Sequence, residues 1–188
     1  MGFDAMFFGR IDYQDKNKRM NDKTMEWVWM PSNELGTDVN IFAHTLYQGY
    51  GSPEGFGFDI LDDNNDIPWI NNQTSPDYNG PEMAKKLIEH LQVRQEHYLT
   101  DDLFVLIGED FRFMEAENNY RSIDNMIDYM NENHNDEYFF KYSTPSIYID
   151  ALKEKEVVWP TKYDDLFPYA DDPESYWTGY FTSRANDK

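Results

Sequence analysis

The clearest structural signal in the chain is the stretch Leu103-Phe104-Val105-Leu106-Ile107-Gly108-Glu109-Asp110. It opens with five apolar residues that do not alternate with polar ones. Such a run is typical of a buried parallel strand that is covered on both faces. Gly108 ends the run, and two carboxylates follow at once. We therefore predict a strand over 103–107 that presents Glu109 and Asp110 at its carboxyl end.

Further strand patterns and helical patterns alternate on both sides of this stretch. Strands are predicted over 5–8, 40–46 and 138–142. Helices are predicted over about 16–30, from Pro81, over about 118–131, and over 145–153. A long loop rich in Gly, Pro, Asn and Asp fills about 47–80, and loops of this length in a compact domain are usually functional. The alternation predicts an α/β fold with parallel strands and right-handed crossovers. A complete α/β barrel needs about 250 residues, so the chain is either a small open sheet or part of a barrel.

Polar side chains follow each predicted strand, where α/β folds bind their ligands. They are Arg10, residues 47–51, Glu109 with Asp110, and residues 143–144. Adjacent residues of an extended segment point to opposite sides, so only one of the two carboxylates can face a pocket. Asp110 suits a general acid whose pKa is raised by partial burial. A retaining glycosidase needs a second carboxylate about 5–5.5 Å away, and none is evident. The alternative is that Glu109 and Asp110 cap the next segment or bind Arg112.

The composition limits the classes of partner. Of the 188 residues, 40% are hydrophobic and 17% aromatic, which indicates a packed core. The formal net charge of -20 would repel nucleic acid and anionic membranes, so neither is an expected partner. General solubility is the simpler explanation of that charge. The chain has no cysteine, which excludes disulfides and thiolate metal sites.

Three weaker motifs bear on ligands. Residues 62–66 are similar to a calcium loop, but Ile67 stands where glycine is required and Gln73 where the glutamate belongs, which favours a solvated turn. The four histidines show no ligand spacing, so no complete zinc site is expected. Asn72-Gln73-Thr74 is an N-glycosylation sequon, which matters only in a secretory protein.

Five blocks of the sequence carry a resemblance to a known family. In order along the chain they are Gly2-Phe3-Asp4-Ala5-Met6-Phe7-Phe8-Gly9-Arg10-Ile11-Asp12-Tyr13-Gln14-Asp15-Lys16, Gly108-Glu109-Asp110-Phe111, Tyr142-Ser143-Thr144-Pro145, Asp164-Asp165-Leu166-Phe167-Pro168-Tyr169-Ala170-Asp171, and Tyr176-Trp177-Thr178-Gly179-Tyr180-Phe181-Thr182-Ser183-Arg184. Together these blocks resemble lysosomal-type α-mannosidases of glycoside hydrolase family 38. They keep the order that the family has, and they span nearly the whole chain.

The resemblance implies a fold and three site residues. Residues 1–173 would form the C-terminal part of a seven-stranded (β/α) catalytic barrel, and 174–188 the truncated start of the middle helical domain. Asp110 matches the family's general acid/base, and Arg10 matches an arginine that hydrogen-bonds near the nucleophile. Tyr50 matches a tyrosine that lines the mannose pocket. The implied activity is retaining hydrolysis of α-linked mannose in glycoprotein N-glycans, in the lumen of the lysosome or vacuole.

The resemblance also marks what is missing. The family binds a zinc cofactor through a His-x-Asp pair, the aspartate nucleophile and a further histidine, and none of these falls within the chain. Ala185 stands where the family usually has proline. The amino terminus has no signal-peptide pattern. It is as typical of the cut end of a fragment as of a natural amino terminus. We therefore expect the isolated chain to be inactive without the remainder of the polypeptide.

Two other classes of function remain open. The chain could be a short, non-catalytic module that binds glycans or another partner. It could also be a small acidic α/β binding domain unrelated to glycans.

Overall fold

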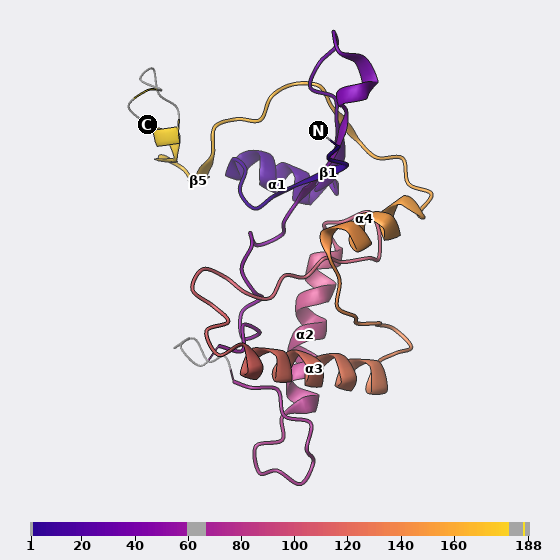
Figure 1. The fold of residues 1–188 in the computed structure, drawn as a ribbon, viewed down its shortest axis with the longest axis vertical. Helices are drawn as coiled ribbons and strands as arrows, with labels where there is room; N and C mark the ends of the chain where they lie inside the picture. The colour runs from indigo at the N-terminus through magenta and orange to yellow at the C-terminus, as the bar shows by residue number, and fades with distance from the viewer. Residues whose placement is uncertain (1, 60–66, 181–185, 187–188) are drawn as a thin grey trace. The chain divides into compact units, whose positions relative to one another are not determined.

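The computed structural model describes residues 2–59, 67–180 and 186, and the chain divides into two compact units. Unit 1 comprises Met1–Gly49, Glu96–Asp101 and Glu156–Lys188. Unit 2 comprises Tyr50–Gln95 and Asp102–Lys155. Each unit is described separately below, and Figure 1 labels the main elements.

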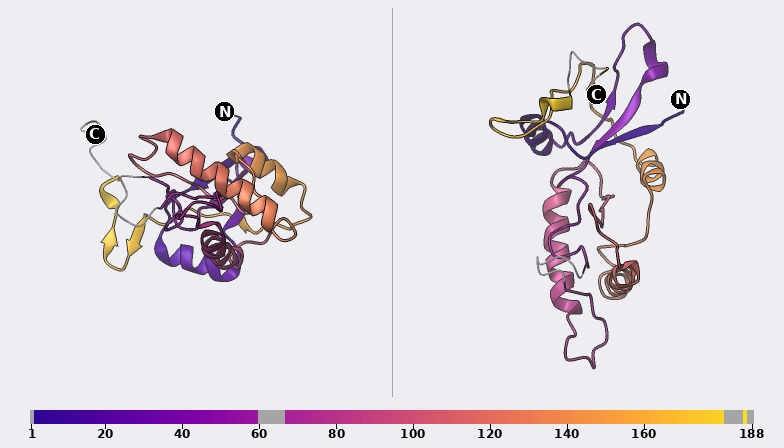
Figure 2. Two further views of the ribbon diagram at one scale, coloured as in Figure 1. Left: turned by 90° about the horizontal axis from the view of Figure 1, so that it is seen from below. Right: turned by 60° about the vertical axis from the view of Figure 1, so that its left-hand side comes forward.

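A four-stranded sheet organises unit 1, in the order β1-β3-β2-β4. Its strands are β1 (Ala5–Phe8), β2 (Glu26–Trp29), β3 (Ile41–Thr45) and β4 (Thr161–Lys162). β1 pairs with β3 in parallel and β2 with β4 in parallel, whereas β2 and β3 are antiparallel. Figure 2 shows the long strands side by side. The strands predicted over 5–8 and 40–46 are confirmed, and the sheet is mostly parallel, as expected. The antiparallel pair was not expected.

The helix predicted over 16–30 is wrong in its second half. Helix α1 (Tyr13–Asp22) begins where the Asp12 carboxylate accepts hydrogen bonds from two backbone N–H groups. It ends at Lys23, which adopts the left-handed conformation that closes many helices. The chain then enters β2, whose Trp-Val-Trp sequence suits a pleated, half-buried surface better than a helix.

The remaining elements of unit 1 are short. They are the 3₁₀ helix η1 (Gly36–Val39), the hairpin strands β5 (Ala170–Asp172) and β6 (Ser175–Tyr176), and the 3₁₀ helix η2 (Thr178–Tyr180). Trp27 lies in the interior of the unit and is 1% exposed. Its ring stacks on Phe8, and the Arg19 guanidinium carbon lies 3.8 Å from the ring centroid. The described residues form this sheet and hairpin, so the seven-stranded barrel stays a prediction.

Unit 2 is built from helices. α2 (Gly80–Gln95), α3 (Ala116–Asn133) and α4 (Pro145–Lys153) confirm three predicted helices. α3 crosses α2 (Figure 1), and their apolar faces enclose the core. The buried core members are Phe56, Phe58, Trp69, Met83, Ala84, Leu87, Leu91, Ile123, Met126 and Met130. The described part of the long loop, up to Asn79, contains no helix or strand, as predicted.

The strand predicted over 103–107 is not present in the structure, although its burial pattern is. Leu103, Val105 and Ile107 pack against the core of α2 and α3. Between them, Phe104 stacks on Tyr148 of α4, with ring centroids 5.1 Å apart. Both sides of the segment are thus covered, as the apolar run predicted. However, helices cover them, and no described strand pairs with the segment's backbone.

The strand predicted over 138–142 is also absent, for a similar reason. Tyr138 and Phe140 pack against the same core. The Asn131 side chain of α3 donates a hydrogen bond to the Phe140 carbonyl and accepts one from its N–H, both at 2.8 Å. One side-chain amide therefore takes the place that a neighbouring strand would occupy.

Candidate active site

The loop that carries Asp110 is hydrogen-bonded to the loop that carries Tyr50. The Gly108 N–H donates to Ser52 Oγ at 2.7 Å, and the Ser52 N–H donates to the Gly108 carbonyl at 3.0 Å. A Cβ on Gly51 would lie 3.6 Å from the Glu109 carboxyl carbon, so these loops are in van der Waals contact. Two of the three predicted site residues therefore lie on adjoining loops of unit 2. We call this arrangement the loop junction.

The backbone after Asp110 is strained. Phe111 and Phe113 have φ values of 62° and 60°, a region that residues with bulky side chains rarely adopt. Such conformations cost about 1–3 kcal/mol each and persist only where the surroundings enforce them. Here the Phe113 N–H donates to the buried Asp59 carboxylate at 3.1 Å, and the Arg112 N–H donates to the Glu109 carbonyl at 3.2 Å. Two residues with this strained backbone therefore lie within three positions of the predicted acid.

The side chains of Glu109 and Asp110 are both exposed. We expected partial burial of Asp110, and the described residues do not provide it. The Glu109 carboxylate lies against Gly51. Phe111 is 90% exposed, which is unusual for a large apolar side chain. The loop junction thus exposes the Asp110 carboxylate and the Phe111 ring to its surroundings.

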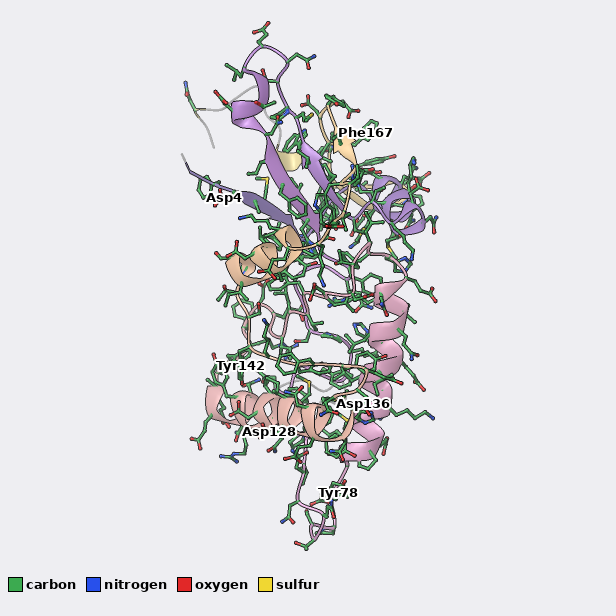
Figure 3. The ribbon with its side chains drawn as sticks, turned by 90° about the vertical axis from the view of Figure 1, so that its right-hand side faces the viewer. Asp4, Tyr78, Asp128, Asp136, Tyr142 and Phe167 are labelled. Atoms are coloured by element: carbon green, nitrogen blue, oxygen red, sulfur yellow. The ribbon has the colours of Figure 1, made fainter. Side chains whose placement is uncertain are left out.

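Three aromatic rings continue from this loop along α3, and we call them the aromatic strip: Phe113, Tyr120 and Tyr142. The ring centroids are 5.4 Å and 6.4 Å apart in succession. The Tyr142 hydroxyl donates to Asp124 Oδ1 at 2.7 Å. Partial burial and this hydrogen bond raise the pKa of Tyr142, so the phenol stays protonated at neutral pH. Figure 3 shows Tyr142 beside α3, the helix that also bears Asp128.

The sequence did not identify the residues that shape this region. Ser52, Asp59 and Tyr120 act through contacts between segments more than 50 residues apart or through a helix face. A weak signal exists for Asp59, a carboxylate in a loop segment otherwise made of Gly and Phe. Its burial at 4% exposure could not be read from that pattern.

Arg10 belongs to unit 1 and is held by aromatic rings. Its guanidinium carbon lies 5.5 Å from the centroid of Trp177 and 5.8 Å from that of Tyr169, which are themselves stacked. Trp177 Nε1 donates to the Asp171 carboxylate at 3.2 Å. Hydrogen bonding from Ser175 lowers the pKa of Asp171, which keeps it charged. These cation–π contacts connect three of the five blocks. Since Asp110 lies in unit 2, the convergence of Arg10 and Asp110 stays a prediction.

Comparison with known proteins identifies the family. The model of the glycosyl hydrolases family 38 N-terminal domain matches residues 1–172. The chain belongs to glycosyl hydrolase family 38. An alpha-mannosidase of Arabidopsis thaliana is 42% identical over 186 residues, which is 97% of this chain and 18% of the relative. Lysosomal alpha-mannosidases of Dictyostelium discoideum and Cavia porcellus are 40% and 37% identical, each over 98% of this chain and 18% of the relative.

This family 38 chain therefore spans about a fifth of the length of the curated relatives it matches. The described residues contain no helix that is both long and apolar enough to cross a membrane.

The described part of this family 38 chain does not fit a zinc ion. Residues 2–59 and 67–180 contain no group of three or more His, Asp or Glu side chains able to hold a metal. Two histidines have other roles: His44 Nδ1 lies 2.9 Å from Glu26 Oε1 in a buried pair, and His97 Nδ1 lies 3.1 Å from the Met20 carbonyl. Residues 62–66, whose sequence is similar to a calcium loop, lie outside the described residues.

Proposed function

We propose that this chain is part of the catalytic domain of an α-mannosidase that hydrolyses α-linked mannose in glycoprotein N-glycans with retention of configuration. Membership of glycosyl hydrolase family 38 and relatives named alpha-mannosidases support the proposal. The structural observation that carries it is the loop junction, because it brings the Asp110 loop and the Tyr50 loop into contact.

In this proposal Asp110 is the general acid/base. Its carboxyl group protonates the glycosidic oxygen as the leaving sugar departs, and its carboxylate then activates water against the glycosyl-enzyme. Exposure of Asp110 allows it to reach the substrate. Tyr50, on the adjoining loop, contacts the mannose ring. Arg10, oriented by Tyr169 and Trp177, hydrogen-bonds near the nucleophile.

The catalytic barrel requires further polypeptide. We propose that 103–107 and 138–142 become barrel strands when that polypeptide supplies their neighbours. Their covered side chains and extended composition already suit such strands. Residues 1–173 would belong to the barrel and 174–188 would begin the helical domain.

Zinc binding and the nucleophile are assigned to residues outside this chain. Zinc would supply Lewis-acid contacts to sugar hydroxyls. Because the family resemblance puts these groups outside the chain, we expect the isolated chain to be inactive. An address in the lumen of the lysosome or vacuole is proposed because two of the relatives above are named lysosomal.

The proposal is tested with the complete polypeptide that contains this chain. We expect it to release mannose from 4-nitrophenyl α-mannoside, with the α-anomer appearing first by ¹H NMR, and to lose activity in a zinc chelator. A first product that is the β-anomer would contradict retention. Glycan binding without any turnover would favour the non-catalytic module instead, a possibility that the exposed rings of Tyr120 and Tyr142 in the aromatic strip leave open.

A further inference from the structure

The described part of the long loop before α2 is fastened to unit 2 at its base. The Ile70 N–H donates to Asn79 Oδ1 at 2.8 Å, and Asn79 Nδ2 donates to the Pro68 carbonyl at 2.9 Å. Asn71 Nδ2 donates to the Asn125 carbonyl of α3 at 2.7 Å. The segment beyond these anchors projects past α2 and α3, as the position of Tyr78 shows in Figure 3.

Asn72 begins the projecting turn and differs from its neighbour Asn71. Asn72, Gln73 and Thr74 are all exposed. Asn72 Oδ1 accepts two hydrogen bonds, from the Thr74 N–H at 3.0 Å and from Thr74 Oγ1 at 2.8 Å. This arrangement is an Asx turn, in which an asparagine side chain takes the place of a backbone carbonyl. The Ser75 N–H donates to the Asn72 carbonyl at 3.0 Å and completes the turn.

The turn places an amide and a hydroxyl as N-glycosylation requires. The acceptor pattern is Asn-x-Ser/Thr, and Asn72-Gln73-Thr74 is its single occurrence in the sequence. The Thr74 hydroxyl contacts the carbonyl oxygen of the amide that would react. Asn72 Nδ2 makes no hydrogen bond to the residues that the structure describes, whereas the amide groups of Asn71 and Asn79 are used by the fold.

We propose that Asn72 is an N-glycosylation site. Asn72 Nδ2 forms a bond to the anomeric carbon of an oligosaccharide carried on a lipid pyrophosphate. The bond from that carbon to the pyrophosphate oxygen breaks, the lipid pyrophosphate leaves with the bonding electrons, and Nδ2 loses one proton. The site rests on the secretory address in the proposed function, because the donor and its transferase belong to that pathway.

The folded unit can accommodate the product. A glycan is bulky and solubilising, and it needs a surface position. The anchors at Ile70, Asn71 and Asn79 hold the base of the loop without using Asn72. The buried Trp69 lies three positions before Asn72 in the sequence, so the core ends before the turn begins.

The test expresses the chain behind a cleavable secretion signal in eukaryotic cells. Lysate and medium are both analysed, so a retained chain is still scored. We expect one mobility step that a peptide-N-glycosidase removes, with conversion of Asn72 to aspartate seen by mass spectrometry. Asn72→Gln and Thr74→Ala should abolish the step. Thr74→Ser, which keeps the hydroxyl, should retain it.

Because the secretion signal is supplied, the result does not depend on the natural address. An unmodified parent chain in both fractions would overturn the site, and so would a step that persists in Thr74→Ala. Failure of the proposed address would be seen separately, as an untagged complete protein that never enters the secretory pathway.

Discussion

The two units of the chain treat similar apolar segments differently. In unit 1, residues 5–8 and 41–45 pair as strands of a sheet. In unit 2, residues 103–107 and 138–142 are as apolar or as aromatic, yet they form no strand among the described residues. Their side chains are covered by helices, and part of their backbone hydrogen bonding goes to side chains. An apolar run therefore predicts that a segment is covered, whereas a strand also needs a neighbouring backbone.

Helix side chains serve as substitutes for that neighbour. Arg94 of α2 donates from Nη1 to the Phe104 carbonyl at 3.1 Å, and Asn131 of α3 makes two hydrogen bonds with Phe140. Buried backbone groups must be paired, so each of these side chains helps to fix its segment in place.

The largest effects should come from the two most buried tryptophans, one in each unit. Trp27 and Trp69 are each 1% exposed. Truncating such a side chain to alanine typically costs about 3–5 kcal/mol of unfolding free energy, because contacts are lost and a cavity remains. Hydrogen exchange should speed up in β1–β3 for Trp27→Ala and in α2 and α3 for Trp69→Ala. Trp177→Ala, at 44% exposure, is the control and should change stability far less. Equal acceleration of both units by either variant would contradict the division into units.

The two hydrogen bonds between the Asn131 side chain and the Phe140 backbone can be removed by one substitution. Asn131→Ala leaves the Phe140 N–H and carbonyl without their side-chain partner, which costs about 1–3 kcal/mol for a buried polar group. Amides of 138–142 should exchange faster, and the urea midpoint should fall. Asn133→Ala is the matched control, since Asn133 donates one exposed bond to the Tyr129 carbonyl of its own helix. A fall in the urea midpoint of the same size in both variants would contradict the claim that Asn131 takes the place of a neighbouring strand.

The cap of α4 offers a smaller effect. Thr144 Oγ1 accepts a hydrogen bond from the Ile147 N–H, and Pro145 occupies the first turn. Thr144→Ala should cost about 1 kcal/mol, as loss of such a cap usually does. Because Tyr148 of α4 covers Phe104, amides of 103–107 should also lose protection. Thr144→Ser should restore both the stability and the amide protection. If Thr144→Ala weakens α4 but leaves exchange in 103–107 unchanged, α4 does not hold that segment.

The last effect develops only at alkaline pH and belongs to unit 2. Burial and a hydrogen bond with Tyr78 raise the pKa of Tyr129 to about 12, from an unfolded value of about 10. A raised pKa means that the folded state holds the proton more tightly, so this contribution is complete below pH 10 and is lost as pH rises towards 12. Tyr129→Phe should therefore lose less stability than the parent between pH 9 and pH 11.5 in urea titrations. Parallel pH curves for both proteins would contradict this.

The sequence predicted the elements whose boundaries are determined by neighbouring residues. The bounds predicted for 145–153 agree with α4, because Thr144 and Pro145 determine the helix start within one turn. The strand β2 was missed because Lys16 to Met30 has one helical composition, and the turn at Lys23 divides it.

Long-range causes were not accessible from the sequence. The sequence places Asp110 directly after an apolar run, and the structure brings the Asp110 loop into contact with the Tyr50 loop. The rim that these residues were expected to share with Arg10 stays a prediction. The left-handed backbone at Phe111 and Phe113 was not foreseen, since nothing in those residues favours it. It accompanies a hydrogen bond to Asp59, 54 residues earlier.

The central claim is that Asp110 is the acid/base of an α-mannosidase, and a leaving-group comparison tests it most directly. In the complete polypeptide, Asp110→Asn should lower kcat/KM for an unactivated mannobiose by about 10²–10⁴-fold, the usual contribution of a general acid. It should spare 2,4-dinitrophenyl α-mannoside, whose leaving group needs no proton, while Asp128→Asn on α3 leaves both rates unchanged. Mannobiose turnover by Asp110→Asn within threefold of the parent would contradict the account.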